Sequence, residues 1–226
     1  MDLNGKVIVV TGGLGTLGRA ATAAAVAAGA TTVCVDFVDG TPADGVIATP
    51  AVDLGNAEAA KAALAAIAEK YGKIDGLVNI AGGFAWETVT DGAIDTWDSM
   101  YQMNVRTAVN ACKGAIPFFP EAGGRIINIS AAGSIKADMG MGAYAASKAG
   151  VAKLTEALAQ ELKARNITVN ALLPSIIDTK PNRDSMPDAD VSTWVSPAAL
   201  ADVILFLLSK ASEPVTGALI PVMGRV

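Results

Sequence analysis

The sequence has no histidine among its 226 residues and only two cysteines, Cys34 and Cys112. The lack of histidine excludes Ser-His-Asp and Cys-His catalysis and every zinc site that needs an imidazole ligand, and we predict no metal site. Acid–base chemistry near neutral pH must then use a carboxyl group, a lysine or a tyrosine with a shifted pKa. Both cysteines fall in apolar segments, so we expect buried packing residues rather than a disulfide framework.

Long apolar runs and an excess of positive charge are also missing. Hydrophobic residues make up 52% of the chain, but no run approaches the roughly 20 residues that span a bilayer. The first residues lead directly into a strand pattern, which predicts that there is no signal peptide. The net charge of −5 argues against nucleic acid or an anionic membrane as a main partner. We therefore expect a cytoplasmic globular protein with no nucleic-acid or membrane partner.

Residues 7–19 are the most informative stretch of the chain. The β-branched run 7–10 predicts a buried strand, and an alanine-rich helix is expected from about 17 to 28. The strand is followed by four glycines within seven residues, Gly12, Gly13, Gly15 and Gly18. A glycine turn between a strand and a helix directs backbone N–H groups and the positive helix end toward a phosphate.

The spacing Gly13-x-Gly15-x-x-Gly18 matches the dinucleotide-binding fingerprint. Asp36 ends the next predicted strand, 18 residues after Gly18, where a carboxylate takes the adenosine ribose hydroxyls. Glycines alone also fit an ordinary tight turn. The strand before them, the helix after them and the acidic residue together favour nucleotide binding.

Strand and helix patterns alternate along the rest of the chain. After the strand that Asp36 closes, we predict strands at 46–52, 74–78, 125–130, 167–172 and 218–222. We predict helices at 57–71, 96–118, 144–164 and 197–208, and no regular element within 175–196. This alternation implies a parallel sheet covered on both faces. We expect one domain, residues 1–226, with a three-layer, doubly wound, Rossmann-like α/β fold and a ligand at the carboxyl ends of the strands.

Tyr144 and Lys148 begin one of the predicted long helices. Their i, i+4 spacing places the phenol and the ammonium on the same helix face. An ammonium close to a phenol favours the phenolate, so we expect the pKa of Tyr144 to fall from about 10 toward the physiological range. Such a tyrosine can exchange a proton with an alcohol or carbonyl oxygen. The pair also occurs by chance on solvated helices, but here it follows a strand-end serine in a nucleotide-binding pattern.

These motifs, in this order, resemble the classical short-chain dehydrogenase/reductase family over nearly the whole chain. The matching residues are Thr11, Gly12, Gly18, Asp53-Leu54, Asn79-Ile80-Ala81-Gly82, Asn104, Ser130, Tyr144, Lys148, Val169-Asn170-Ala171 and Pro174. The resemblance implies an oxidoreductase that transfers hydride between a nicotinamide cofactor and a carbonyl or alcohol group of a small-molecule substrate.

The resemblance also implies roles for individual residues. Tyr144 would be the catalytic acid/base, assisted by Lys148, which also holds the nicotinamide ribose, and by Asn104, which binds a relay water. Ser130 would hydrogen-bond the substrate oxygen. Cofactor contacts are expected from Gly12, Leu14, Gly15, Thr16, Leu17, Gly18, Asp36, Phe37, Asp53, Leu54, Asn79, Ala81, Gly82, Tyr144, Lys148, Pro174, Ile177 and Thr179.

Two positions depart from the family pattern. Thr16 stands where the usual Thr-Gly-x-x-x-Gly-x-Gly turn has its middle glycine. The family serine commonly lies 13 residues before the tyrosine, and that position is Ala131 here. Ser130 takes its place if the loop is one residue longer, and Ser134 is another candidate. Otherwise the active site has no serine.

Residues 173–194 are similar to the C-terminal segment of dihydropteridine reductases, which use NADH and have alanine in place of the serine. An NADH-dependent reductase of that kind and a catalytically silent NAD-sensing protein are therefore alternatives to a dehydrogenase. Met186 and Trp194 either cover the substrate or pack against the last helix. Trp86 and Met139 are further candidates for the pocket wall.

The cofactor type and the assembly state follow from two further features. A carboxylate at Asp36 accepts ribose hydroxyls but repels a 2′-phosphate, and its neighbours Phe37 and Val38 supply no cation. NAD(H) is therefore favoured over NADP(H). The helices predicted at 96–118 and 144–164 carry many alanines and few charges, as self-associating faces do, so we expect a homodimer or homotetramer.

Overall fold

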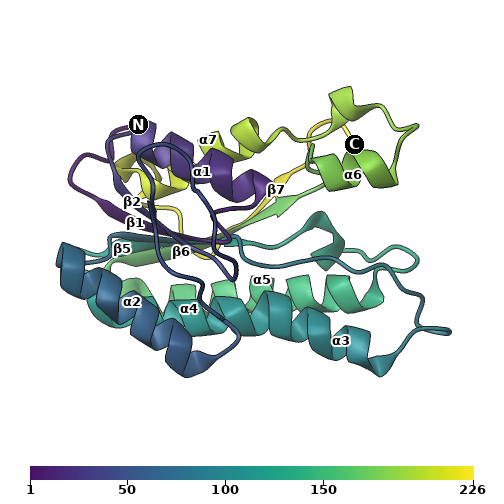
Figure 1. Cartoon of the computed structure of the whole chain (residues 1–226), viewed down its shortest axis with the longest axis horizontal. Helices are drawn as coiled ribbons and strands as arrows, with labels where there is room; N and C mark the ends of the chain where they lie inside the picture. The colour runs from purple at the N-terminus through teal and green to yellow at the C-terminus, as the bar shows by residue number, and fades with distance from the viewer.

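A computed structural model describes residues 1–226, and its centre is a seven-stranded parallel sheet (Figure 1). The strands are β1 (Val7–Thr11), β2 (Thr31–Val35), β3 (Ile47–Ala48), β4 (Gly76–Asn79), β5 (Gly124–Ile129), β6 (Ile167–Pro174) and β7 (Leu219–Val222). They pair in the order β3-β2-β1-β4-β5-β6-β7. The order reverses between β1 and β4, so a crevice opens there at the carboxyl ends of the strands.

Helices cover both faces of this sheet (Figure 1). Helices α1 (Thr16–Ala27) and α7 (Pro197–Leu208) pack on one face, and α2 (Ala57–Tyr71), α4 (Thr107–Ala115) and α5 (Gly142–Leu162) pack on the other. Helix α3 (Ile94–Met100) precedes α4, and the short α6 (Lys180–Ser185) follows β6. The predicted three-layer, doubly wound fold is confirmed.

The core is divided into two layers by the alternation of side chains along the strands. Val9 and Leu77 join the cluster beneath α2, α4 and α5, whereas their neighbours Ile8 and Val78 join the cluster beneath α1 and α7. A period of two is what a strand requires, and burial of both faces explains why the strands read as continuous apolar runs. None of the helices is both long and apolar enough to span a membrane.

Local signals set the ends of α2 where the sequence predicts them. The Asn56 side chain accepts hydrogen bonds from the N–H groups of Glu58 and Ala59, at 3.0 and 3.1 Å. Gly72 ends the helix with φ +82, a left-handed conformation that favours glycine. The predicted and observed bounds of this helix coincide.

The third predicted strand, 46–52, is wrong in length, because β3 comprises only Ile47 and Ala48. The backbone continues beside β2 through single bonds from Thr49 N to Cys34 O and from Val52 N to Asp36 O. Pro50 stands between them and has no N–H to donate, so a regular ladder stops there.

Two other predictions miss irregular backbone. The helix predicted at 96–118 is divided into α3, a π-helical turn Tyr101–Arg106, α4 and a 3₁₀ turn Ile116–Phe118. The segment 175–196 contains α6 and a 3₁₀ turn Val191–Thr193. Helix α6 forms without buried residues because Thr179 caps it and Pro181 occupies its first turn. Apolar periodicity detects neither a π turn nor a helix of this kind.

Candidate active site

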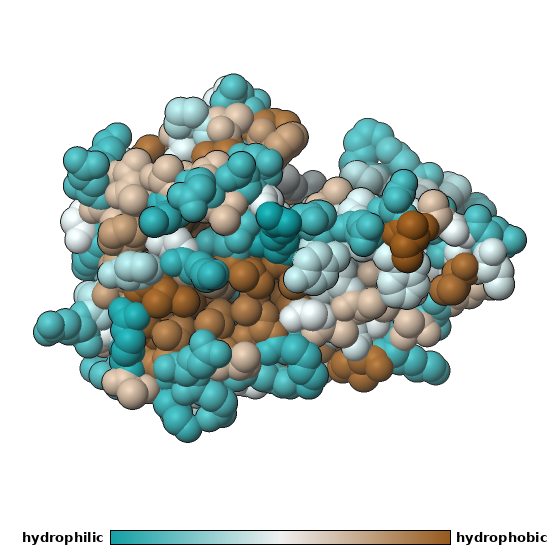
Figure 2. All heavy atoms as spheres, turned by 90° about the horizontal axis from the view of Figure 1, so that it is seen from below, coloured by the Kyte–Doolittle hydropathy of each residue, from teal (hydrophilic) through white to brown (hydrophobic).

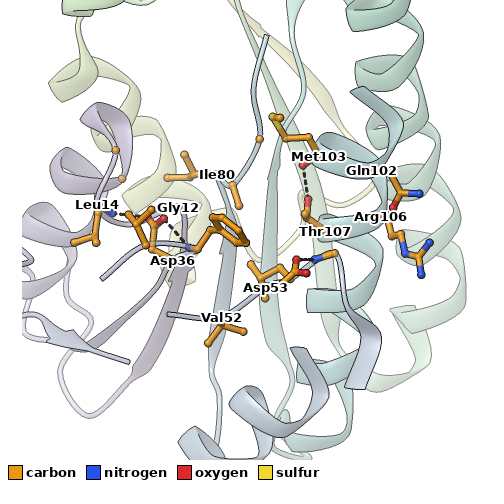
Figure 3. A pocket seen from close by; sticks show the side chains of 18 of the residues that line it. Gly12, Leu14, Asp36, Val52, Asp53, Ile80, Gln102, Met103, Arg106 and Thr107 are labelled. Atoms are coloured by element: carbon orange, nitrogen blue, oxygen red, sulfur yellow. Dashed lines mark hydrogen bonds between the residues drawn. The ribbon is translucent and has the colours of Figure 1, made fainter. Parts of the chain in front are cut away.

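A cleft of about 1330 Å³ lies at the carboxyl ends of β1, β2 and β4, where the sequence predicts the ligand. Its lining includes many of the residues predicted to hold a cofactor. These are Gly12, Leu14, Gly15, Thr16, Leu17, Gly18, Asp36, Phe37, Asp53, Leu54, Ala81 and Gly82. In Figure 3, Gly12, Leu14 and Asp36 face the cleft from one side, and Gln102, Met103 and Arg106 lie on the other.

The glycine turn is built by close backbone contacts. Gly12 has φ +65, and a Cβ there would lie 2.7 Å from Ala81 N. A Cβ on Gly18 would lie 2.1 Å from the carbonyl oxygen of Gly12. Thr11 Oγ1 accepts hydrogen bonds from the N–H groups of Ile80 and Ala81, both at 3.2 Å. These contacts join the turns after β1 and β4 into one floor of the cleft.

The structure changes which glycines matter in the fingerprint. Gly13 does not line the cleft; a Cβ there would lie 2.4 Å from the Cys34 sulfur, so this glycine is needed for packing against β2. Thr16, at the departure from the family pattern, is exposed and lines the cleft at the start of α1. No side chain caps this helix and its first turn has no acidic residue. Its positive end is therefore available to an anion.

Asp36 lies at the end of β2 as predicted. One carboxylate oxygen accepts a hydrogen bond from Leu14 N at 2.9 Å, and the other accepts one from Phe37 N at 2.8 Å. Phe37 and Val38 are exposed beside it. The nearby cation, Arg19, donates its Nε–H to the Leu14 carbonyl at 2.9 Å. The carboxylate is thus fixed at the cleft wall without a side-chain cation bonded to it.

The Asp53-Leu54 turn is held from below by α4. Asn110 donates to the carbonyl oxygens of Leu54 and Gly55, at 2.9 and 3.2 Å, and Asp53 accepts from Gly55 N at 2.8 Å. The turn then leads into the capped start of α2, whose first residues also line the cleft.

The far wall of the cleft comes from α3, the π turn and α4, and sequence reasoning missed it. This wall consists of Ser99, Gln102, Met103, Arg106 and Thr107. Elsewhere in the cleft, the lining residues that the sequence did not predict are Val38, Val52, Gly55, Asn56, Ala57, Glu58 and Ile80. The wall residues recur at i, i+3, i+4, i+7 and i+8, the spacing of one helix face, and that periodicity is a signal that would have identified them.

Asn104 lies in the π turn and is 2% exposed. Its Oδ1 accepts from Gly83 N at 2.9 Å, and its Nδ2 donates to Gly83 O at 3.1 Å and to Ser147 Oγ at 2.9 Å. Ser147 Oγ in turn donates to the carbonyl oxygen of Tyr144 at 2.7 Å. Asn104 therefore connects the turn after β4 with the first residues of α5, which carry Tyr144 and Lys148.

Gly82 connects Asn104 and Lys148 with the cleft. It lines the cleft, and a Cβ at this position would lie 2.4 Å from Asn104 Oδ1 and 3.5 Å from Lys148 Nζ. Lys148 is buried and donates to the carbonyl oxygen of Ile129 at 2.9 Å, while its Nζ lies 5.9 Å from the centroid of the Tyr144 ring. Phe84 contacts the Tyr144 ring edge to face, with 4.9 Å between the two ring centroids.

The expected lowering of the Tyr144 pKa is wrong for this structure. Burial raises the pKa of Tyr144 to about 12, because the phenolate is the form that burial penalises. Burial also lowers the pKa of Lys148 to about 8, for the opposite reason. In both groups desolvation outweighs the attraction that the i, i+4 spacing suggested.

The geometry argues against the expected role of Ser130. Its side chain is 1% exposed and its hydroxyl donates to the carbonyl oxygen of Lys148 at 2.8 Å, so its only proton is already used. Ser134 donates to the carbonyl oxygen of Ala131 at 2.7 Å. Ala131, at the family's serine position, has no hydroxyl. No serine hydroxyl of this loop is left with a free proton for a substrate.

Six residues predicted to contact the cofactor lie outside the cleft lining: Asn79, Tyr144, Lys148, Pro174, Ile177 and Thr179. The Asn79 side chain is buried and donates to Asn128 Oδ1 at 2.8 Å, its register partner on β5, so it connects strands. Pro174 ends β6 beside Val222. Ile177 pairs with Val195, and Thr179 caps α6.

The two residues proposed for a substrate cover also separate in the structure. Trp194 is 8% exposed, so its indole packs inside the protein, as the second interpretation expects. Met186 follows α6 and is half-buried. Nearby, the exposed Arg183 donates two hydrogen bonds to the carboxylate of half-buried Asp178.

The fold and the cleft together define a doubly wound dinucleotide-binding protein, and comparison with known proteins specifies the class. A family model for short chain dehydrogenases matches residues 6–190. The chain therefore belongs to the short-chain dehydrogenase/reductase family, whose members are oxidoreductases that bind nicotinamide cofactors.

Relatives match the chain over nearly its full length. It is 32% identical over 245 residues to the 3-oxoacyl-(acyl-carrier-protein) reductase FabG of Thermotoga maritima, covering 99% of this chain and 98% of that protein. It is 29% identical to meso-2,3-butanediol dehydrogenase of Serratia marcescens, covering 99% and 95%. The structure of carveol dehydrogenase from Mycobacterium avium in complex with NAD superposes with a TM-score of 0.88 at 25% identity, covering 98% and 97%.

Proposed function

We propose that the protein is an NAD(H)-dependent oxidoreductase that transfers hydride between nicotinamide and a carbonyl or alcohol carbon, with Tyr144 as the acid/base. The observation that carries the proposal is the arrangement around Gly82, a glycine that lines the cleft while Asn104 and Lys148 lie against it. Gly82 thus connects the cleft with Asn104 and Lys148, and Lys148 Nζ lies 5.9 Å from the centroid of the Tyr144 ring.

The chain's residues fit a dinucleotide cofactor. Gly12, Gly18 and Gly82 leave backbone surface where side chains would collide with their neighbours. The uncapped start of α1 would hold the diphosphate, and Asp36 would accept the adenosine ribose hydroxyls. When bound, the nicotinamide supplies or accepts the hydride, and the protein positions it and manages the proton.

The proton is the task of Tyr144 in this proposal. Because burial raises its pKa to about 12, the phenol keeps its proton at neutral pH and can donate it to a carbonyl oxygen during reduction. Lys148, with a pKa of about 8, still carries charge at neutral pH and would favour the phenolate that remains. Asn104 and Ser147 hold the start of α5 against Gly83 and so orient the phenol.

The preference for NAD(H) rests on electrostatics at the end of β2. A 2′-phosphate beside Asp36 would meet a fixed carboxylate, and neither Phe37 nor Val38 offers a compensating charge. Arg19 is engaged by the Leu14 carbonyl, and Arg106 belongs to the far wall of the cleft.

A second candidate is a reductase that works without a serine, of the dihydropteridine-reductase kind. The observation that favours it is that Ser130 and Ser134 both donate to backbone carbonyls, while Ala131 has no hydroxyl. A quinonoid acceptor that is already electron-poor depends less on a second donor than a simple ketone does. A screen of NADH oxidation with quinonoid dihydropterin and small ketones separates the two candidates.

The test of the main proposal is Tyr144→Phe. We expect turnover to fall by about 10³-fold or more, because general acid–base catalysis supplies on the order of 10²–10⁴. NADH affinity, measured by fluorescence titration, should change by less than about 3-fold, since the ring remains. If the wild type binds NADH but converts nothing in a broad carbonyl, alcohol and quinonoid-pterin panel, the NAD-sensing alternative holds instead.

We also propose that copies of the chain associate through the face of α4 and α5. Figure 2 shows this side of the molecule, where an apolar area lies left of the centre between polar margins. Half-buried Val109 and Leu154 lie on these helices, beside many alanines. A contiguous apolar area of this kind is typical of a subunit interface. Sedimentation of the protein tests whether it is a homodimer or a homotetramer.

A further inference from the structure

The loops that follow β4 and β5 carry large apolar side chains that the core does not use. Phe84 and Trp86 are each 57% exposed, and Met139 is 78% exposed. Scattered exposed apolar residues are common, but these lie on two loops that contact each other beside Tyr144. We call Phe84, Trp86 and Met139 the apolar wall.

The wall is held in place by contacts between the two loops. Trp86 packs on Gly140, where a Cβ would lie 2.1 Å from Trp86 Cε2 and where φ is +77. Glu87 N donates to the Gly140 carbonyl oxygen at 2.8 Å. Phe84 contacts the Tyr144 ring edge to face at 4.9 Å. The aromatic side chains are therefore positioned relative to the phenol before any ligand arrives.

Polar side chains around the phenol are already engaged. Ser130, Ser134 and Ser147 each donate to a backbone carbonyl oxygen. Gly133, whose Cβ position lies 4.0 Å from Tyr144 Cε1, offers no side chain. The side chain that contacts the phenol ring is therefore apolar, and Phe84, Trp86 and Met139 expose an apolar surface beside it.

We propose that the apolar wall selects substrates that carry a hydrophobic ring next to the reacting carbon, with Phe84 and Trp86 as specificity-determining residues. The inference rests on the proposed function, because Tyr144 defines where the reacting carbon lies. A small molecule is favoured over a protein partner because Phe84 touches the Tyr144 ring, and a protein seated there would cover the phenol.

The experiment compares two methyl ketones, butanone and the aryl ketone acetophenone, with saturating NADH. Removing an aromatic side chain from an apolar subsite costs about 10-fold or more in selectivity. We expect Trp86→Ala to lower kcat/KM for the aryl ketone by about 10-fold, mostly through KM, and to change kcat/KM for butanone by less than about 2-fold. Phe84→Ala also removes a contact of the Tyr144 ring, so we expect it to lower kcat/KM for the aryl ketone by about 10-fold more than for butanone. Phe84→Leu should recover part of the loss.

The matched control is Phe206→Ala on α7, which removes a 38% exposed phenylalanine from the opposite face of the sheet and should leave both ketones unchanged. Equal losses on both ketones, or no loss on either, would overturn the inference. So would dissociation of an oligomer by Trp86→Ala in sedimentation, since the wall would then be a subunit contact.

Failure of the proposed function is distinguished by binding. Calorimetry measures the affinity of the aryl ketone for the NADH complex of Tyr144→Phe, with and without Phe84→Ala. If the wild type reduces neither ketone, the proposed reaction is wrong, and this measurement still decides the inference. A roughly 10-fold weaker affinity with Phe84→Ala supports it, and absence of binding contradicts it.

Discussion

The two ends of the site differ in whether backbone or side chains form them. At the end proposed to hold adenosine, which we call the adenosine end, the cleft is shaped by backbone: Gly12 against Ala81, Gly18 against Gly12, and N–H groups bound by Thr11. At the reaction end, side chains from three elements meet: Asn104 from the π turn, Lys148 and Tyr144 from α5, and Phe84 from the loop after β4. Backbone sites tolerate change in side chains but not in glycine, whereas side-chain sites depend on the identity of each group.

Gly12→Ala is expected to have the largest effect at the adenosine end. The added Cβ would lie 2.7 Å from Ala81 N, and φ +65 strains alanine as well. We expect NADH affinity to fall by about 100-fold, equivalent to about 2.7 kcal/mol. Gly5→Ala is the matched control, because Gly5 has φ +71 but nothing within 4 Å of its Cβ position. An equal loss of NADH affinity in both variants would show that backbone strain, not the contact with Ala81, is responsible.

Asp36→Ala tests a side chain at the backbone-built end. Removing the carboxylate relieves repulsion of a 2′-phosphate and loses an acceptor for ribose hydroxyls. We expect the ratio of kcat/KM for NADH to that for NADPH to fall by about 10-fold or more, or about 1.4 kcal/mol. Unchanged selectivity would mean that Asp36 does not contact the ribose.

The buried ammonium at the reaction end predicts how stability varies with pH. The pKa of Lys148 in the folded protein is about 8, below its ordinary value of 10.5, so the unfolded chain binds more protons between these values. The free energy of unfolding of the cofactor-free protein should therefore rise from pH 8 to pH 10, by at most about 1.4 kcal/mol per pH unit. Above pH 10 the raised pKa of Tyr144 acts in the opposite direction.

Urea titrations at pH 7, 8.5 and 9.5 measure this rise. Lys148→Met should flatten it, whereas Lys153→Met, which changes an exposed lysine on the same helix, should not. A rise that persists in Lys148→Met would assign the proton release to another group.

Ser130→Ala is expected to have the smallest effect on activity. Because the hydroxyl already donates to Lys148 O, we expect less than about a 3-fold change in kcat/KM and a loss of about 1 kcal/mol in the free energy of unfolding. A severe loss of turnover would show that Ser130 does hydrogen-bond the substrate oxygen. Ala131→Ser gives the complementary measurement, since it puts a hydroxyl at the family's serine position.

The sequence was sufficient for the fold and for about half of the residues that line the cleft, for physical reasons. Buried strands, alanine-rich helices and glycine turns are local patterns, and Asp36 and Asp53 follow strands directly. Gly13 shows the limit of such patterns, because it fits the fingerprint but packs on Cys34. Spacing does not reveal which neighbour each glycine meets.

The reaction end was less predictable because it depends on how distant segments meet. The sequence singles out Asn104 as a candidate, but the π turn that carries it leaves no trace in apolar periodicity. The predicted direction of the Tyr144 pKa shift is wrong because burial of the phenol, which Phe84 contacts, is a tertiary property. The bond from Ser130 to Lys148 joins residues 18 positions apart, and no local motif shows it.

The contact between Trp86 and Gly140 has a consequence for evolution and engineering. Because the two loops share this contact and the bond from Glu87 to Gly140, neither can be exchanged with a homologous loop independently. A side chain at position 140 would displace the indole, and a shorter residue at 86 would leave the glycine without a partner. Loop grafts intended to change the chemistry of this scaffold should therefore transfer 83–93 and 131–141 as one unit.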